Sequence, residues 1–250
     1  MCTVVILRRP GHDWPLLFAA NRDEMADRPW LPPGRHWPDR PRVVGGKDQL
    51  VGGTWLAVSD RGLIAGVLNR PGSLGPAPGM RSRGELPLEA LEHATAADAA
   101  DALRHIEPES YRSFNLVVAD AVAAYWVRSG EDGGPVAATP VPDGLSMITA
   151  HDMNDLGSAR IRRYRALFRG AAVPDPEAGD WRAWQTLLAS RETDAGAGPE
   201  GAMTIVTAGG FGTVSSSLLA LPRPGRRGVE PRFLFAAGRP DRVPFAAVSL

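Results

Sequence analysis

The residue best suited to take part in a reaction is Cys2, which follows Met1 and is the only cysteine of the chain. An initiator methionine before a small residue is normally removed, and Cys2 would then carry both a thiol and a free α-amine. The unperturbed pKa is about 7.7–8.0 for such an amine and about 8.5 for the thiol, so the amine can serve as the general base for its own side chain. The predicted chemistry is attack on an acyl carbon, followed by hydrolysis of the thioester. A lone cysteine is more often a small buried side chain than a nucleophile. The residues around Cys2 must therefore distinguish between these two roles.

The second group of interest is the tetrad Asn21-Arg22-Asp23-Glu24, which directly follows an apolar run. One interpretation is a solvated strand end with a local ion pair. The functional interpretation is that Asp23 orients the α-ammonium of Cys2, while Arg22 favours the thiolate by lowering the thiol pKa.

The elements around these residues predict that they meet. Residues 4–7 form a short β-branched apolar run and residues 16–20 a second one, with a turn containing Pro10 and Gly11 between them. Two such runs separated by turn residues indicate a β-hairpin. The hairpin places the tetrad at the end where the first strand begins, which is where Cys2 lies.

Periodicity predicts the remaining elements. Residues 26–53 are rich in Pro, Arg, Gly and Trp and indicate a long surface excursion. Further strands are predicted at residues 54–59, 63–69, 114–119, 123–127, 146–150, 202–207, 215–221 and 233–236. Helices are predicted at residues 86–93, 96–105 and 158–168, and after Asp180 as far as residue 189. Strand pairs, then helices, then strand pairs favour an α+β layered domain over a βαβ series.

Composition limits the class of protein. With 250 residues the default is one domain spanning residues 1–250. Lys+Arg and Asp+Glu both number 28, so the net charge is zero, and nucleic acid or an anionic membrane is a poor expectation for a main partner. No segment matches a signal peptide or a membrane span, which favours a cytoplasmic protein. Basic residues that are nearly all arginine, with abundant Ala, Gly and Pro, are typical of a GC-rich bacterial genome.

Several weaker candidates for functional residues also have simpler interpretations. His151-Asp152 followed by Asn154-Asp155 lacks ligand pairs at helical spacing, so no metal site is predicted, and His151 is better interpreted as a pocket residue near substrate or oxyanion. Residues 215–217 are three serines in a strand pattern without the glycines of a nucleophile elbow. The aromatic residues Trp30, His36, Trp37 and Trp55 could line a pocket, although the first three could equally anchor a long loop. The arginines of the predicted helix, Arg160, Arg162, Arg163 and Arg165, are expected to form a solvated face.

The ordered motifs resemble one known family. The segments are Met1-Cys2-Thr3, Ala19–Glu24 with Arg28-Pro29, Gly52–Ser59 with Asn69, Arg83–Leu86 and Phe114–Asp120. This series resembles the NRDE family, which includes the transport and Golgi organisation protein 2 homologues. The resemblance spans most of residues 1–221.

The resemblance implies a fold and a site. The family is similar to penicillin V acylases and bile salt hydrolases, which have the four-layer αββα N-terminal-nucleophile fold of two antiparallel sheets. The resemblance implies that Cys2 is the nucleophile and that Asp23 and Arg22 act beside it. The candidate residues for substrate or oxyanion contacts are Asn21, Asn69, His151 and Trp55. The acylases place their arginine where this chain has Ala20. Ala150 stands where family members commonly have the oxyanion asparagine, and Val214 where they often have arginine.

Two hypotheses follow. The first is an amidohydrolase-like protein that uses Cys2 on a non-peptide C–N bond of a small acyl-amide, with no cofactor. The second, motivated by Ala150, is a non-catalytic protein on the same fold that binds and carries haem, a lipid or an acyl-CoA. Either would take a small-molecule ligand, and either could form a homo-oligomer.

Overall fold

The computed structural model describes residues 2–129 and 134–250, so Met1, whose removal is predicted, lies outside the described residues. The chain divides into two compact units. The first unit contains the residues up to Asp27 together with Pro142–Ser249, and the second contains Arg28–Val141 with Leu250. A single domain over residues 1–250 stays a prediction.

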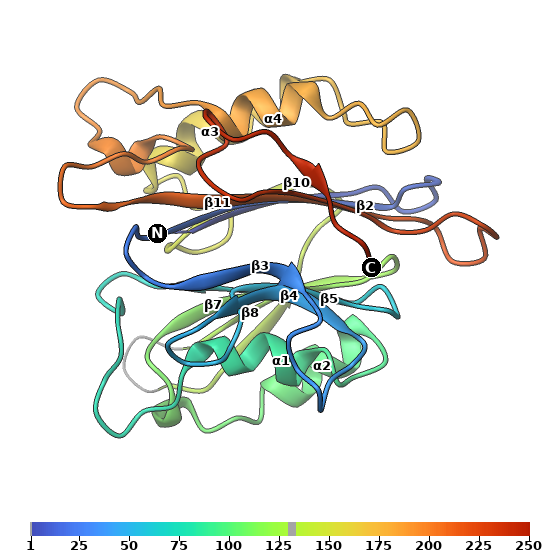
Figure 1. Ribbon diagram of the computed structural model, residues 1–250, viewed down its shortest axis with the longest axis horizontal. Helices are drawn as coiled ribbons and strands as arrows, with labels where there is room; N and C mark the ends of the chain where they lie inside the picture. The colour runs from blue at the N-terminus through green and yellow to red at the C-terminus, as the bar shows by residue number, and fades with distance from the viewer. Residues whose placement is uncertain (1, 130–133) are drawn as a thin grey trace. The chain divides into compact units, whose positions relative to one another are not determined.

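The first unit is built on a six-stranded antiparallel sheet in the order β10-β1-β2-β11-β12-β13. Its strands are β1 (Thr3–Arg8), β2 (Leu16–Met25), β10 (Gly144–Ile148), β11 (Phe211–Leu221), β12 (Arg232–Ala236) and β13 (Ala246–Ala247). Its helices are α3 (Ala159–Gly170), α4 (Arg182–Ala189) and the short 3₁₀ helix η3 (Pro199–Gly201). Helices α3 and α4 lie along one face of this sheet (Figure 1).

The alternation of β-strand side chains explains how this face is buried. Val5 of β1 and Leu17 of β2 belong to the same apolar cluster as Tyr164 of α3 and Trp184 of α4. Residues two apart in a strand share a face, so each strand gives every second side chain to the helices. Phe168 meets Trp184 edge to face, with ring centroids 5.5 Å apart. We call this side of the sheet the helix face.

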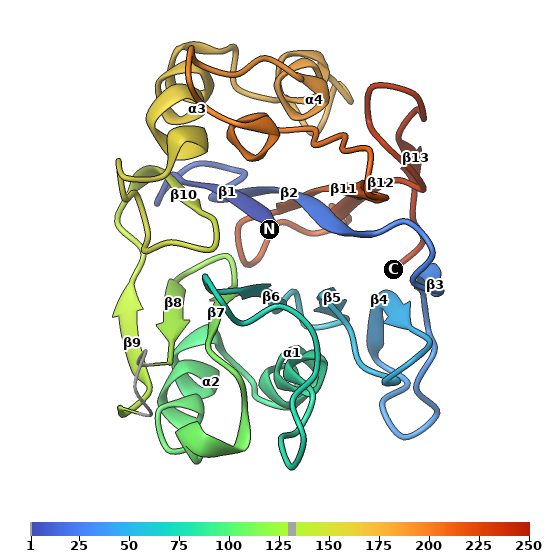
Figure 2. The same cartoon turned by 90° about the vertical axis from the view of Figure 1, so that its left-hand side faces the viewer.

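The second unit is built on a seven-stranded antiparallel sheet in the order β3-β4-β5-β6-β7-β8-β9. Its strands are β3 (Trp30–Gly34), β4 (Val43–Asp48), β5 (Leu56–Ser59), β6 (Ile64–Asn69), β7 (Phe114–Ala119), β8 (Ala124–Arg128) and β9 (Ala137–Pro140). Its helices are η1 (Arg83–Glu85), α1 (Leu86–Ala90), α2 (Ala96–Leu103) and η2 (Pro108–Ser110). Helices α1 and α2 lie on one face of this sheet (Figure 2).

Two of the sequence motifs meet in the second unit as a backbone contact. The amide of Thr54 donates a hydrogen bond of 2.9 Å to the carbonyl oxygen of Gly84. A Cβ atom on Gly53 would lie 2.5 Å from the carbonyl carbon of Gly84, closer than real contacts allow. Glycine is therefore needed at position 53 because two backbones touch, and the contact joins the Gly52–Ser59 motif to Arg83–Leu86.

Most predicted elements are confirmed, and the α+β class with two antiparallel sheets is confirmed with them. The prediction of a long surface excursion over residues 26–53 is wrong, because this segment contains β3 and β4. Pro32 and Pro33 obscure β3 in the sequence, yet β3 is an edge strand, where proline is tolerated. The apolar pattern of the sequence predicts no strand at β9 or β13, which the structure adds.

The strand predicted at residues 202–207 is also wrong. This segment bends and has only one bridge, between Val206 and Gly212. Its polar groups bond to the end of α4 and the turn after it: Thr204 donates to Ser190 O through its amide and to Leu188 O through its hydroxyl. A β-branched composition predicts a strand, but this backbone caps a helix end.

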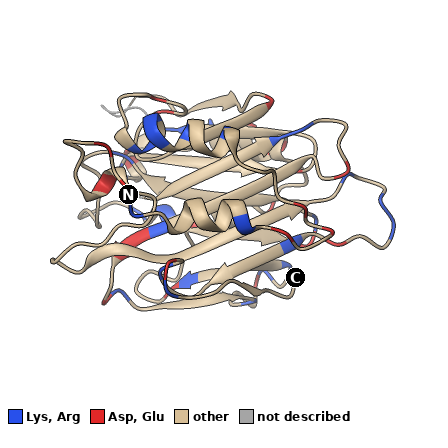
Figure 3. Ribbon diagram, turned by 90° about the horizontal axis from the view of Figure 1, so that it is seen from above, with Lys and Arg blue, Asp and Glu red and all other residues tan. Residues whose placement is uncertain are grey.

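Acidic and basic residues are interspersed along the ribbon (Figure 3). Within the described parts of the chain, no helix has the length and apolar character needed to traverse a bilayer.

The glycine contact yields a stability test. Gly53→Ala forces a methyl group against the backbone of Gly84, so we expect a loss of about 1–3 kcal/mol in the free energy of unfolding. Chemical denaturation measures it. Gly209→Ala is the matched control, because a Cβ there meets nothing within 4 Å, and its stability should be unchanged or slightly higher. Equal effects of the two substitutions would contradict the contact.

Candidate functional site

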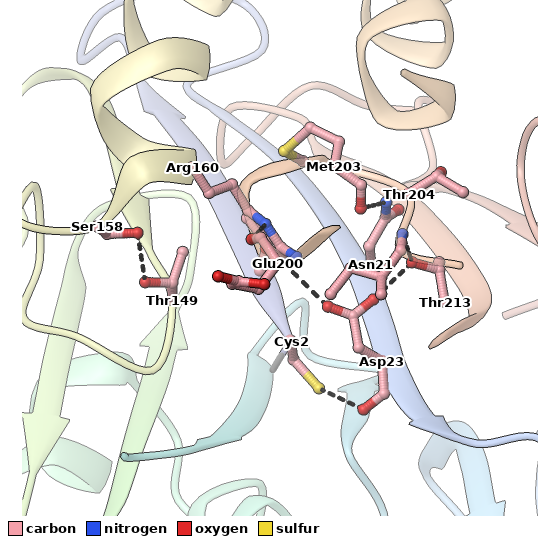
Figure 4. Close-up of polar contacts among 12 residues, drawn as sticks. Cys2, Asn21, Asp23, Thr149, Ser158, Arg160, Glu200, Met203, Thr204 and Thr213 are labelled. Carbon is pink, nitrogen blue, oxygen red and sulfur yellow. Dashed lines mark hydrogen bonds and ion pairs between the residues drawn. The ribbon is translucent and has the colours of Figure 1, made fainter. Parts of the chain in front are cut away.

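Cys2 directly precedes β1 and lies beside the tetrad on β2. The register pairs Thr3 with Asn21, so the start of β1 faces the far end of β2. The Cys2 thiol donates a long hydrogen bond of 3.9 Å to the backbone oxygen of Asp23 (Figure 4). The hairpin predicted from the sequence therefore brings Cys2 to the tetrad.

The surroundings of Cys2 favour its protonated form. The side chain is half-buried, and burial raises the pKa of the Cys2 thiol above its usual value. The positive charge at the N-terminus opposes this rise, and the negative charge of Asp23 adds to it. The hydrogen bond to the backbone oxygen of Asp23 and the charge of Arg22 lower the thiol pKa by smaller amounts. At neutral pH such a thiol needs a base to become a nucleophile.

The tetrad is divided between the two faces of the sheet. Asn21 and Asp23 lie two residues apart on β2 and point to the helix face, so Arg22 points to the opposite face. Cys2 precedes Thr3, whose hydroxyl also lies on the helix face, and strand alternation therefore places the Cys2 side chain on the face of Arg22. We call this side the Cys2 face.

Asn21 is held by three hydrogen bonds. Its amide nitrogen donates to Leu188 O at 3.0 Å and to Met203 O at 2.8 Å, and its Oδ1 accepts from Ser216 Oγ at 2.6 Å. Both N–H groups of the amide are used, so neither remains to hold a substrate or an oxyanion. The geometry favours a structural role, in which Asn21 joins β2 to the end of α4 and to the segment before β11.

Asp23 is the centre of a buried polar network (Figure 4). Its Oδ2 accepts from Arg160 Nη1 at 3.0 Å, and its Oδ1 accepts from Thr213 Oγ1 at 2.6 Å. Arg160 Nη1 also donates to Thr3 Oγ1, and Arg160 Nε donates to Glu200 O at 3.1 Å. One arginine from α3 thus connects β1, β2 and η3 beside Cys2.

The expectation of a solvated arginine face is wrong for Arg160, which is 2 % exposed. The helical period carries the missed signal, because residues 160, 164 and 168 share one face and the last two are the buried Tyr164 and Phe168. Arg163 behaves closer to expectation, with ion pairs to Glu192 and Asp194 near the surface. Ser158 caps the start of α3, since its side-chain oxygen accepts a hydrogen bond from the amide of Ile161.

A β-bulge in β11 lies next to Asp23. The register pairs Thr213 with Asp23 and Ser215 with Arg22, which leaves Val214 as the extra residue. The bulge lets Thr213 point to the helix face, where its hydroxyl accepts from Ile205 N at 2.9 Å and donates to Asp23. Bulges next to functional sites commonly re-aim one side chain in this way.

Two predicted site residues belong to the second unit. Asn69 is the last residue of β6 and pairs in register with Phe114. Trp55 stacks edge to face on Trp30, with ring centroids 5.7 Å apart. Trp37, from the same aromatic group, donates its indole N–H to Gly52 O at 2.8 Å, which favours the interpretation that it anchors a loop.

His151 follows β10, the strand that pairs with β1. Its Nδ1 lies 3.8 Å from Asp155 Oδ2, and both side chains are partly exposed. Ala150, at the position where an asparagine was expected, is fully buried and offers no side-chain donor. Among the residues that the structure describes, no group of three or more His, Cys, Asp or Glu is arranged to hold a metal ion.

Solved structures with low sequence identity share this fold over nearly the whole chain. The Caenorhabditis elegans N-acylethanolamine-hydrolyzing acid amidase ortholog is 11 % identical with a TM-score of 0.54, covering 99 % of this chain and 100 % of that one. The C2A mutant of conjugated bile acid hydrolase from Clostridium perfringens is 13 % identical with a TM-score of 0.53, covering 100 % and 97 %. These likenesses show the fold, which is that of the N-terminal-nucleophile hydrolases.

A family model shows the family, and sequence relatives over about half of the chain agree with it. The mouse Transport and Golgi organization 2 homolog is 33 % identical over 147 residues, which are 52 % of this chain and 50 % of the relative. The chain thus spans about half the length of the curated relatives it matches. The family model described as Transport and Golgi organisation 2 matches residues 1–168, and the chain therefore belongs to the Transport and Golgi organisation 2 family.

Proposed function

We propose that the protein is an N-terminal cysteine amidohydrolase-like enzyme that cleaves a non-peptide C–N bond of a small acyl-amide. The observation that carries the proposal is the position of Cys2, at the start of β1 and against the backbone of Asp23. An acid amidase and a bile acid hydrolase with the same fold support the class of reaction.

The proposed reaction needs Cys2 as the first residue of the mature chain. The free α-amine takes the proton from Sγ as the sulfur attacks the acyl carbon. The tetrahedral intermediate collapses, the C–N bond breaks, and the leaving nitrogen takes the proton from the α-ammonium. Water then attacks the thioester with the α-amine as base, which releases the carboxylic acid and restores the thiol.

The raised pKa of the Cys2 thiol fits this sequence of steps. A thiol that stays protonated at rest is activated when its own amine removes the proton during attack. Arg22, on the same face, favours the thiolate as it forms. Arg22 therefore stabilises mainly the thiolate that forms as the sulfur attacks the substrate.

Asp23 and Arg160 take the positioning roles in this proposal. Asp23 orients the α-ammonium, as its place beside Cys2 and Thr3 suggests. Arg160 holds Thr3 and Asp23 at the same time, so it fixes the residues on both sides of the nucleophile. His151, together with backbone N–H groups, is the proposed oxyanion donor, because Ala150 supplies none.

The first test concerns Cys2 itself. Intact mass of the purified protein should show loss of Met1, and incubation with p-nitrophenyl hexanoate should add one hexanoyl group on Cys2. Cys2→Ala should add none and should lose turnover of any amide substrate. Cys2→Ser keeps a weaker nucleophile and should be acylated much more slowly. Equal turnover by native protein and Cys2→Ala would sink the proposal.

A second test uses the thiol pKa. Because Arg22 lowers the pKa of Cys2, Arg22→Gln should raise it and reduce the thiolate fraction at neutral pH, where each unit of pKa is about tenfold. We expect alkylation of Cys2 by iodoacetamide at pH 7.5 to slow severalfold, with the rate recovering at higher pH. Arg162→Gln, on the exposed side of α3, should leave the pH profile unchanged. A profile unaffected by Arg22→Gln would argue against this role.

The second candidate function is non-catalytic binding of haem or an acyl lipid. Ala150 favours it, since loss of one oxyanion donor costs on the order of 10²–10³ in rate. Spectroscopic titration with haem, and calorimetric titration with acyl-CoA, should show no saturable binding if the amidohydrolase proposal holds. Saturable micromolar binding that persists in Cys2→Ala, with no acylation of the native protein, would select the carrier instead.

A further inference from the structure

Ser215 carries a hydroxyl that the fold does not use. The residue is 1 % exposed, and its Oγ has no hydrogen-bond partner anywhere in residues 2–129 and 134–250. Buried hydroxyl groups almost always have a partner, so an orphan in a strand needs an explanation. Its neighbour Ser216 shows the usual pattern, since it donates to Asn21 Oδ1 and lies 3.2 Å from Ala20 O.

The register and the bulge decide where this hydroxyl points. Ser216 and Thr213 both reach the helix face, where they bond to Asn21 and Asp23. Ser215 lies next to Ser216 and pairs across the strands with Arg22, so it points to the Cys2 face. The same strand therefore serves structure on one face and leaves a free polar group on the other.

Cys2, Arg22 and Ser215 form a row across three neighbouring strands. Thr3 pairs with Asn21, so Cys2 lies opposite Arg22, and Arg22 pairs with Ser215. Neighbouring strands are about 4.8 Å apart, so Ser215 lies ~10 Å from Cys2 along the row. At this distance Ser215 cannot form a hydrogen bond to the carbonyl group that Cys2 attacks. The distance does fit a hydrogen bond to a substrate group about six bonds from the carbonyl carbon.

We propose that Ser215 is a substrate-binding residue whose hydroxyl pairs with a polar group about six bonds from the scissile carbonyl carbon, which makes the substrate an acyl-amide with a hydroxyl or similar group at that distance. This inference rests on the proposed function of Cys2. The polar group can belong to the acyl chain or to the amine, and the hydrogen-bond chemistry is the same in both.

The test uses two pairs of probes that differ only in a terminal hydroxyl or methyl group. The acyl pair is p-nitrophenyl 6-hydroxyhexanoate and p-nitrophenyl heptanoate, which acylate Cys2 and release p-nitrophenol. The amine pair is N-hexanoyl-4-aminobutan-1-ol and N-hexanoylpentan-1-amine, which are hydrolysed to hexanoic acid and the free amine. Rates are measured for the native protein, Ser215→Ala and the matched control Ser216→Ala.

The expected result separates activity from stability. The native protein should prefer the hydroxyl probe of one pair by about tenfold, the value of one buried hydrogen bond. Ser215→Ala should abolish that preference without lowering Tm, because it removes an unpaired hydroxyl. Ser216→Ala should keep the preference but lower Tm by about 3 °C, because it removes the bond to Asn21.

Three outcomes would overturn the inference about Ser215 without overturning the proposed function. The first is acylation of Cys2 with no preference in either pair, which leaves the proposed function standing. The second is a preference that survives in Ser215→Ala, and the third is a fall in Tm for Ser215→Ala as large as that for Ser216→Ala. If no probe acylates Cys2 at all, the proposed function fails, and the role of Ser215 fails with it.

Discussion

The ion pair between Arg160 and Asp23 is the interaction on which the arrangement around Cys2 depends. Both side chains are buried, and the pair is completed by the hydroxyl groups of Thr3 and Thr213. Removal of one partner from such a pair leaves a buried charge and typically costs about 3–5 kcal/mol. Because Arg160 belongs to α3 and its partners to β1, β2 and η3, the helix cannot shift without disturbing the strand that begins after Cys2.

Strand alternation gives the two faces of the first unit's sheet different polar side chains. On the helix face, Asn21 and Asp23 bond to the protein itself. On the Cys2 face, Arg22 and Ser215 lie in a row with the thiol. The bulge at Val214 keeps this division intact, because it lets Thr213 and Ser216 reach the same face although they are three residues apart.

Local patterns in the sequence were enough to predict the hairpin that brings Cys2 to the tetrad. Both strands are apolar runs, and the turn residues lie between them, so no distant contact had to be known. Arg160 could not be identified by charge, because an arginine in a basic helix is usually solvated, and its partner Asp23 lies 137 residues away. Residues 202–207 were misjudged for a related reason, since their polar groups bond to α4 and the turn after it through tertiary contacts that composition does not reveal.

The alternation along β2 also has a consequence for inherited or evolved variation. Neighbouring positions on this strand are under different selective pressures, because their side chains lie on opposite faces of the sheet. A substitution at Asn21 removes bonds that hold the fold, so it should reduce the amount of protein that survives cellular quality control. A substitution at Arg22, one residue later, changes a buried side chain on the Cys2 face, so it should also shift the pKa of the Cys2 thiol.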